Sequence, residues 1–231
     1  MLASGCGGAA SAAPLARAGV TEGVPVESLA TVTACVVRPE QTEGPFFIDE
    51  RLERSDIRAD PVDGALSPGL PLTLTLLLAR VSAAQCLPLA GALVDIWHCD
   101  ALGRYSDVDD PHAATIGHRF LRGFQTSDAR GTVRFTTIFP GWYRGRTVHI
   151  HIKVRTGLGT PARREFTSQL YFADALTDHV HGQAPYAAVG RRRMRNGDDG
   201  IFRDGGEQLV LAPTTTPTGL EATFGIGMVG I

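Results

Sequence analysis

Long apolar runs and a strong net charge are both missing from this sequence, and each absence excludes a class of protein. No segment approaches the roughly 20 consecutive apolar residues that a membrane-spanning helix needs. The formal net charge is −2 at pH 7, from 22 basic and 24 acidic residues. Neither a nucleic acid nor an anionic membrane surface is therefore an expected partner.

The sequence also lacks a long amphipathic helix pattern, an internal repeat and any sign of a second domain. In their place, short apolar segments alternate with turns in a chain that has 27 glycines and 14 prolines. This pattern predicts an all-β sandwich or barrel with long loops and little helix. Strands are expected at residues 72–81, 92–97, 119–126, 132–139, 147–154, 165–172, 209–212 and 220–226. A hairpin turn is expected at 127–131 and a short helix within 174–188.

Residues 1–30 contain few large apolar side chains and are rich in Ala, Gly and Ser. This composition predicts a flexible leader, followed by a single domain at 31–231. The stretch LASGC at residues 2–6 is similar to the end of a bacterial lipoprotein signal, although the regions that should precede it are missing. We expect an exported bacterial protein, which is periplasmic, extracellular or lipid-anchored at Cys6. An ordinary small-residue signal tail is the alternative to the anchor.

The four cysteines carry a prediction that depends on the compartment. Cys35 and Cys86 flank the first predicted strand, and Cys99 lies in a later loop. In an exported protein, Cys35 with Cys86 is the first disulfide to expect, with Cys99 a buried free thiol. Four unpaired cysteines are the alternative.

The most informative stretch is residues 140–154, which read PGWYRGRTVHIHIKV. Its second half alternates, so that apolar residues take one parity while His149, His151 and Lys153 take the other. A period of two indicates a β-strand, and side chains at i and i+2 point the same way, about 6.6–6.8 Å apart. Two imidazoles in this arrangement can converge on one metal ion, although a pair of surface or core histidines has the same pattern.

Two tyrosines in glycine-rich loops precede this strand. Tyr143 follows Pro140-Gly141-Trp142, a turn that can fold its side chain back over the strand, and Tyr105 lies in the loop GRYS at 103–106. A phenolate is a hard anionic ligand that suits Fe(III). The alternative for each tyrosine taken alone is an ordinary core residue.

These blocks together resemble the intradiol ring-cleaving dioxygenases. The resemblance is carried by WHCDALGRYS at 97–106, by FLRG and by TTIFPGWYRGRTVHIHIKV, with TEGPFF and SQLYF as weaker matches, and it covers residues 35–226. The chain is most similar to a small exported bacterial branch, because it has no room for the helical dimerisation region of catechol-type members. The resemblance implies a β-sandwich of the intradiol type.

The resemblance also implies one mononuclear non-haem Fe(III) per chain. The implied ligands are Tyr105 and His151 as the equatorial pair and Tyr143 and His149 as the axial pair. Tyr143 is also implied as a catalytic base, since its phenolate can take up a substrate proton.

Other residues are implied to bind the substrate rather than the metal. Arg146 matches the family's arginine beside the site, and Gln169 matches the glutamine that stabilises the activated substrate. Pro45, Phe46 and Phe47 are expected to form one wall of the substrate site, or else to be only core. Arg146 has the parity of Val148, so the strand must begin after it, near Thr147.

The implied reaction takes a small aromatic diol and O2, and it cleaves the ring between the two hydroxylated carbons to give a cis,cis-muconate-type product. Such chemistry belongs to the catabolism of aromatic compounds. A cupin-like Fe(II) or Mn dioxygenase also uses a His-x-His strand, but it needs a glutamate that residues 154–155 do not supply. A non-catalytic metal- or ligand-binding β-sandwich module is the alternative of a different class.

Overall fold

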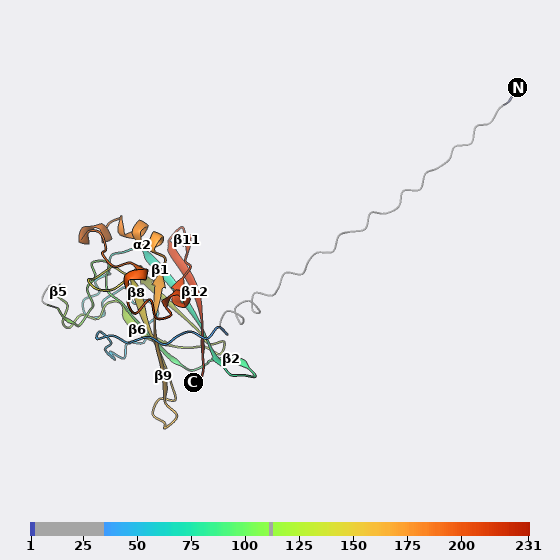
Figure 1. Ribbon diagram of the computed structural model, residues 1–231, viewed down its shortest axis with the longest axis horizontal. Helices are drawn as coiled ribbons and strands as arrows, with labels where there is room; N and C mark the ends of the chain where they lie inside the picture. Colours follow the sequence, from blue (N-terminus) through green and yellow to red (C-terminus); the bar gives the residue numbers. More distant parts are fainter. Residues whose placement is uncertain (3–34, 111–112) are drawn as a thin grey trace.

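The computed structural model describes residues 1–2, 35–110 and 113–231, so most of the predicted leader, with Cys6, lies outside the described residues. Two five-stranded sheets pack against one shared apolar core (Figure 1). The first sheet contains β1 (Pro71–Val81), β2 (Cys86–Pro88), β7 (Thr132–Ile138), β11 (Thr214–Thr216) and β12 (Gly219–Met228). The second contains β3 (Leu93–Trp97), β6 (Arg122–Thr126), β8 (His149–Thr156), β9 (Arg164–Phe172) and β10 (Val210–Leu211). The predicted all-β sandwich is confirmed.

The first sheet is built around β1, whose sequence alternates leucine with threonine. Leu72, Leu74 and Leu76 are fully buried, while the residues between them are only partly covered. On one side β1 pairs with β12 in parallel, and on the other it pairs with β7 and then β2 in antiparallel fashion. Burying each leucine side chain is worth about 1.5–3 kcal/mol, so this row fixes which face of the sheet meets the core.

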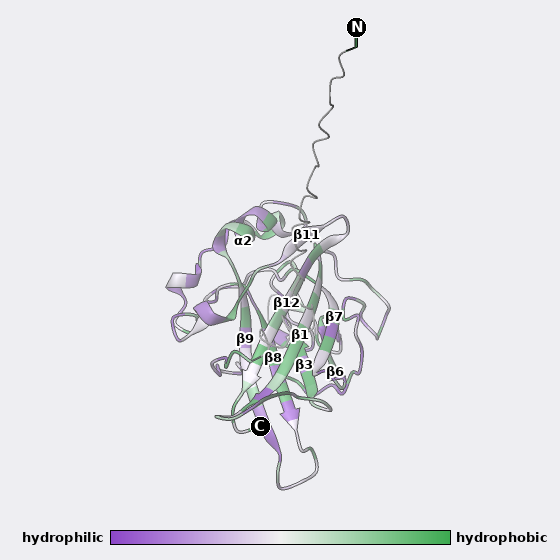
Figure 2. Cartoon of the chain, turned by 90° about the vertical axis from the view of Figure 1, so that its right-hand side faces the viewer, coloured by the Kyte–Doolittle hydropathy of each residue, from purple (hydrophilic) through white to green (hydrophobic). Residues whose placement is uncertain are grey.

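The second sheet places β8 between β9 and β3, with order β10-β9-β8-β3-β6. Ile150, Ile152 and Val154 are fully buried in the core between the sheets, which Figure 2 shows as apolar segments along the inner strands. The opposite face of β8 is buried as well, because the loop at 41–50 crosses it. Ion pairs from Glu43 to Lys153 and from Asp49 to Arg155 attach that loop. The face that carries the two histidines is therefore shielded from water.

The predicted hairpin at 127–131 is wrong. The strand before it pairs with β3 in the second sheet, whereas the strand after it pairs with β1 in the first. In this turn the chain crosses from the second sheet to the first. The Asp128 carboxylate stabilises the turn by accepting hydrogen bonds from the backbone N–H groups of Arg130 and Thr132. Gly131 has φ +73°, and a Cβ there would lie 2.2 Å from the carbonyl oxygen of Leu78. Only glycine lets the crossing chain approach β1 this closely.

Outside the two sheets are a short pair, β4 (Asp109–Asp110) with β5 (Ala113–Ala114), and a helical segment. The range expected to hold a helix contains α2 (Asp174–His181), and η1 (Tyr186–Val189) overlaps its end. Two further short helices follow, η2 (Asn196–Asp198) and η3 (Gly206–Leu209). No helix in the described part of the chain is long and apolar enough to span a bilayer. Cys35 and Cys86 form a disulfide with their Cα atoms 5.8 Å apart, and Cys99 is buried as a free thiol.

Candidate metal centre

The structure brings the four predicted metal-binding side chains together. The Nε2 atoms of His149 and His151 lie 3.0 Å apart, and the hydroxyl of Tyr143 lies 3.2 Å from Nε2 of His149. The ring of Tyr105 is centred 5.6 Å from that of Tyr143 and 6.3 Å from that of His151. Two phenols and two imidazoles from three separate segments thus meet at one place beside β8.

The two imidazoles are oriented by contacts on their far sides. Nδ1 of His149 donates to the carbonyl oxygen of Thr147 at 2.6 Å, which leaves a lone pair on Nε2. The ring of His151 stacks on Trp97 with centroids 4.7 Å apart and planes nearly parallel. Burial, reinforced by Arg146, lowers the pKa of His149 to about 3. Burial and the neighbouring His149 likewise lower the pKa of His151 well below its ordinary value. Both rings are held neutral, which is the form that binds metal ions.

The two tyrosines meet because their loops pack backbone to backbone at two glycines. A Cβ on Gly103 would lie 2.2 Å from the carbonyl oxygen of Trp142, and one on Gly141 would lie 2.4 Å from that of Asp100. The Asp100 carboxylate also accepts the backbone N–H groups of Leu102 and Arg104, so it closes the loop before Tyr105. Any larger residue at either glycine would push the loops apart.

The side chain of Tyr105 is buried and that of Tyr143 is partly buried, and neither environment favours an ionised phenolate. The Tyr105 hydroxyl has no hydrogen-bond partner among the described residues. Burial and the neighbouring Tyr143 raise the pKa of Tyr105 well above its ordinary value. Burial raises the pKa of Tyr143 to about 12, although Arg146 opposes the shift. Neither phenol ionises at neutral pH without a cation, and an unsatisfied buried hydroxyl costs about 1–3 kcal/mol. The four donors therefore fit a hard metal ion that would bind both oxygens as phenolates.

Arg146 and Gln169, the two residues predicted to act on the substrate, are in contact with each other. Nη2 of Arg146 donates to Oε1 of Gln169 at 2.6 Å, and Gln169 pairs with His151 across β9 and β8. The parity conflict at Arg146 disappears because β8 begins only at His149. Gly145 has φ +91°, so the chain changes direction just before Arg146.

The predicted substrate wall is divided by the structure. The ring of Phe46 is centred 4.4 Å from that of Tyr105 and 6.1 Å from that of Tyr143, so it borders the centre. Phe47 packs against Trp97 instead, and Pro45 is exposed. Phe46 is the member of this trio that reaches the two tyrosines.

Two residues that the sequence did not single out hold the site in place. The buried Arg122 donates from Nη2 to the carbonyl oxygen of Ser106 at 2.7 Å and from Nη1 to that of Phe46 at 2.5 Å. It therefore ties the Tyr105 loop to the loop that carries Phe46. Asp199 accepts a hydrogen bond from Nε of Arg146 at 2.9 Å. Arg122 lies in the FLRG block, which marks the resemblance but not this role, and Asp199 has no local sequence signal because its partner Arg146 lies far away in the chain.

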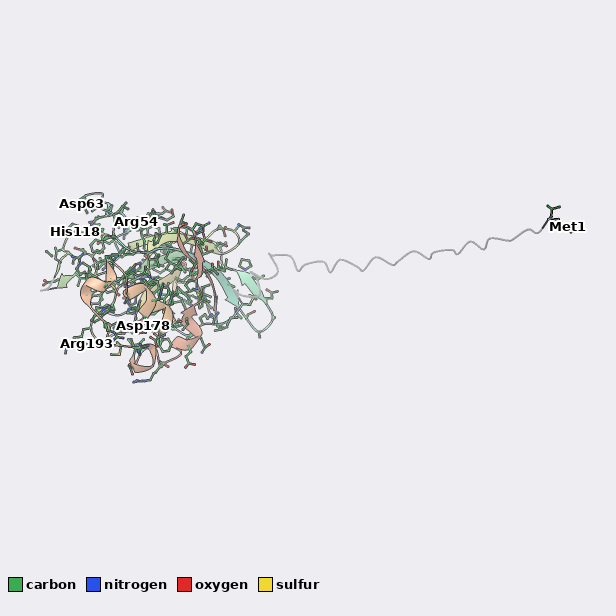
Figure 3. All side chains as sticks on the ribbon, turned by 90° about the horizontal axis from the view of Figure 1, so that it is seen from above. Met1, Arg54, Asp63, His118, Asp178 and Arg193 are labelled. Carbon is green, nitrogen blue, oxygen red and sulfur yellow. A yellow bond between two sulfur atoms is a disulfide. The ribbon has the colours of Figure 1, made fainter. Side chains whose placement is uncertain are left out.

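A second group of possible metal ligands combines the buried Asp60 with Asp63 and His118. Asp63 and His118 are labelled in Figure 3. Nδ1 of His118 is 2.7 Å from the Asp60 carboxylate and 4.0 Å from that of Asp63. The Asp60 carboxylate also accepts the backbone N–H groups of Val62 and Arg119. These contacts explain the group as one that holds two loops together. The group shares no residue with the tyrosine and histidine centre.

A β-sandwich that gathers two tyrosines and two histidines beside one inner strand defines a class of ring-cleaving dioxygenases. Residues 42–199, which are more than half of the chain, match the family model described as Dioxygenase. A solved intradiol ring-cleavage dioxygenase from Tetranychus urticae is 31% identical, with a TM-score of 0.71, and the match covers 85% of this chain and 96% of that one. This chain belongs to the intradiol ring-cleavage dioxygenase family.

Curated relatives point the same way over a shorter span. The protocatechuate 3,4-dioxygenase beta chain of Burkholderia cepacia is 32% identical over an alignment of 144 residues, and the match covers 57% of this chain and 60% of the relative. Catechol 1,2-dioxygenase 2 of Acinetobacter lwoffii is 30% identical over an alignment of 150 residues, and the match covers 57% of this chain and 50% of the relative. The chain thus spans between half and two thirds of the length of these relatives.

Proposed function

We propose that this chain is an intradiol dioxygenase that uses non-haem Fe(III) and O2 to cleave a catechol-type ring between its two hydroxylated carbons. The product would be of the cis,cis-muconate type, with both atoms of O2 incorporated. The observation that carries the proposal is that Nε2 of His149 lies 3.2 Å from the hydroxyl of Tyr143 and 3.0 Å from Nε2 of His151, beside the Tyr105 hydroxyl, which has no hydrogen-bond partner among the described residues. Family membership and the names of the relatives support the reaction class.

We assign Tyr105, Tyr143, His149 and His151 as the residues that would hold the iron. A ferric ion bound there would supply a Lewis acid that takes up both oxygens of the diol and draws electron density from the ring. Two phenolates stabilise the ferric over the ferrous state, so no external reductant is required.

The chain's own residues would handle the protons and charge of the reaction. A diol that binds through both oxygens must lose two protons. Tyr143, with a pKa of about 12 when unbound, is a strong enough base to take one of them, and a solvent-derived hydroxide would take the other to give water. Arg146 would stabilise negative charge that develops on the ring, and Gln169 would orient the same region by hydrogen bonding. Phe46 borders Tyr105 and would limit how the ring of the substrate can lie.

The test combines metal analysis with oxygen uptake. Purified protein should contain one iron per chain and absorb visible light, because tyrosinate bound to Fe(III) gives a charge-transfer band. It should consume O2 with members of a catechol panel and release a ring-opened dicarboxylate. Zinc, or a colourless protein that gains no activity with iron, would instead favour the binding-module alternative. A yellow semialdehyde would mean cleavage beside the diol and would refute the ferric assignment.

We also propose that the protein is exported. The disulfide between Cys35 and Cys86 supports this, because such bonds persist in oxidising compartments. Fractionation of the native host cells with an antibody against the folded domain would test it. Recovery of the domain from the cytoplasm alone would contradict the proposal.

A further inference from the structure

The carboxylate of Asp199 is nearly fully buried and accepts four hydrogen bonds. Its Oδ2 accepts Nε–H of Arg146 at 2.9 Å and the backbone N–H of Thr147 at 2.8 Å. Its Oδ1 accepts the backbone N–H groups of Ile201 at 2.8 Å and Phe202 at 3.3 Å. Burial disfavours its charge, but the donors at Thr147 and Arg146 hold the pKa of Asp199 below its usual value. Asp199 is therefore an ionised group with a fixed orientation.

Both partners of the Asp199 Oδ2 atom lead directly into the proposed site. Arg146 extends beyond Asp199 and donates from Nη2 to Gln169 at 2.6 Å. Thr147 receives the bond from Asp199 at its backbone N–H, and its carbonyl oxygen accepts Nδ1–H of His149 at 2.6 Å. One buried carboxylate thus fixes a cation on the substrate side and, through a single residue, the orientation of a proposed metal ligand.

We propose that Asp199 is a positioning residue that acts through Arg146, holding its guanidinium against the ring of a bound aromatic diol. The inference rests on the proposed function, because Arg146 needs a substrate on which to act. Charge-assisted hydrogen bonds to a guanidinium are short and directional, so they restrict a side chain that otherwise samples many rotamers. An arginine already in place stabilises developing charge without having to reorient during the reaction.

A purely structural role for Asp199 makes a different prediction. The segment at 195–199 is also attached by Asn196, whose Oδ1 accepts the Thr147 hydroxyl at 2.6 Å and whose Nδ2 donates to the carbonyl oxygen of Phe172 at 2.9 Å. These bonds do not involve the Asp199 charge. If Asp199 only fastened the segment, its removal would lower stability without acting specifically through Arg146.

A double-mutant cycle on the iron-loaded enzyme separates the two roles. Asp199→Asn should lower kcat/KM for catechol roughly 10- to 100-fold, as expected for one charge-assisted hydrogen bond, with iron content per chain unchanged. In an Arg146→Leu background, Asp199→Asn should lower kcat/KM by less than about threefold. The effect is small there because the residue through which Asp199 acts is gone. Asp198→Asn, an exposed carboxylate one residue earlier, is the matched control and should behave as wild type.

A second measurement uses the metal-free protein and does not depend on turnover. The Nε–H proton of Arg146 should exchange slowly with solvent in ¹⁵N NMR spectra of the wild type and rapidly in Asp199→Asn. Arg146→Lys tests the same contact without changing Asp199. Lysine keeps the positive charge but cannot bind Asp199 and Gln169 with separate nitrogens. It should lose nearly as much activity as Arg146→Leu.

The outcomes distinguish this inference from the proposed function. Suppose that the wild type turns over catechol but the decreases in kcat/KM caused by Asp199→Asn and Arg146→Leu multiply in the double variant. Asp199 then does not act through Arg146, and this inference fails while the proposed function stands. Full activity in Arg146→Lys, or slow Nε–H exchange retained in Asp199→Asn, would also overturn it. If the iron-loaded wild type consumes no O2 with any catechol, the proposed function fails and this inference fails with it.

Discussion

His98 should make the stability of the fold depend on pH, independently of the metal centre. It follows β3 directly and is fully buried. Its Nδ1 donates to the carbonyl oxygen of Cys99 at 2.8 Å, and its Nε2 lies 2.7 Å from the hydroxyl of Thr137 on β7. The neutral ring therefore bridges the two sheets with both nitrogens satisfied, and a proton added to it would place an unpaired charge in the core.

The size of the effect follows from the pKa of the buried ring. Burial, opposed by the Cys99 carbonyl and aided by Arg122, lowers the pKa of His98 from its ordinary 6.5 to about 4. Between these two values the unfolded chain binds a proton that the folded chain rejects, so stability falls as the pH falls. The free energy of unfolding should decrease by about 2 kcal/mol between about pH 7.5 and pH 5 through this group alone.

Urea unfolding of metal-free protein with the disulfide intact would measure this dependence. His98→Gln should be less stable near neutral pH but should lack about 2 kcal/mol of the acid-induced loss. Thr137→Val keeps the titrating ring while removing its partner, so it should lose about 1–3 kcal/mol at neutral pH and keep the wild-type pH dependence. An equal acid-induced loss in His98→Gln and wild type would refute the reasoning.

Three further predictions concern the site and its frame. Tyr143→Phe should retain iron on three protein ligands but lose about 100-fold or more in kcat, whereas His151→Ala should lose iron on dialysis; full activity in both would refute the assignment. Replacing Cys35 and Cys86 by serine should lower the free energy of unfolding by about 2–4 kcal/mol, and denatured unreduced wild type should show at most two thiols per chain. Gly103→Ala should destabilise the fold by about 1–3 kcal/mol and weaken iron binding, which calorimetry and metal titration would detect; wild-type values would contradict the loop packing.

The strands could be predicted because their signals are local. Alternation at 72–81 and 148–154 specifies which side chains share a face, and hydrophobic burial then selects the inward one. Where the prediction failed, the signal was ambiguous. The turn at 127–131 has hairpin composition, but composition does not say whether the next strand returns to the same sheet. The strand expected from 119 begins at Arg122 because Leu121 adopts φ +54°, and no local sequence feature indicates that conformation.

The sequence by itself determined that His149 and His151 share one face of a strand, since a period of two fixes side-chain direction within any strand. It also supplied the two tyrosines and the glycines beside them, and so the chemical type of the site. Only the tertiary structure decided that Tyr105 and Tyr143 lie 5.6 Å apart and that Asp199 holds Arg146. Spacing along the chain constrains geometry only within one element. Distances between elements depend on how the whole core packs. Tyr105 and Tyr143 are 38 residues apart in the chain, and Arg146 and Asp199 are 53 apart, so no local sequence pattern predicts either contact.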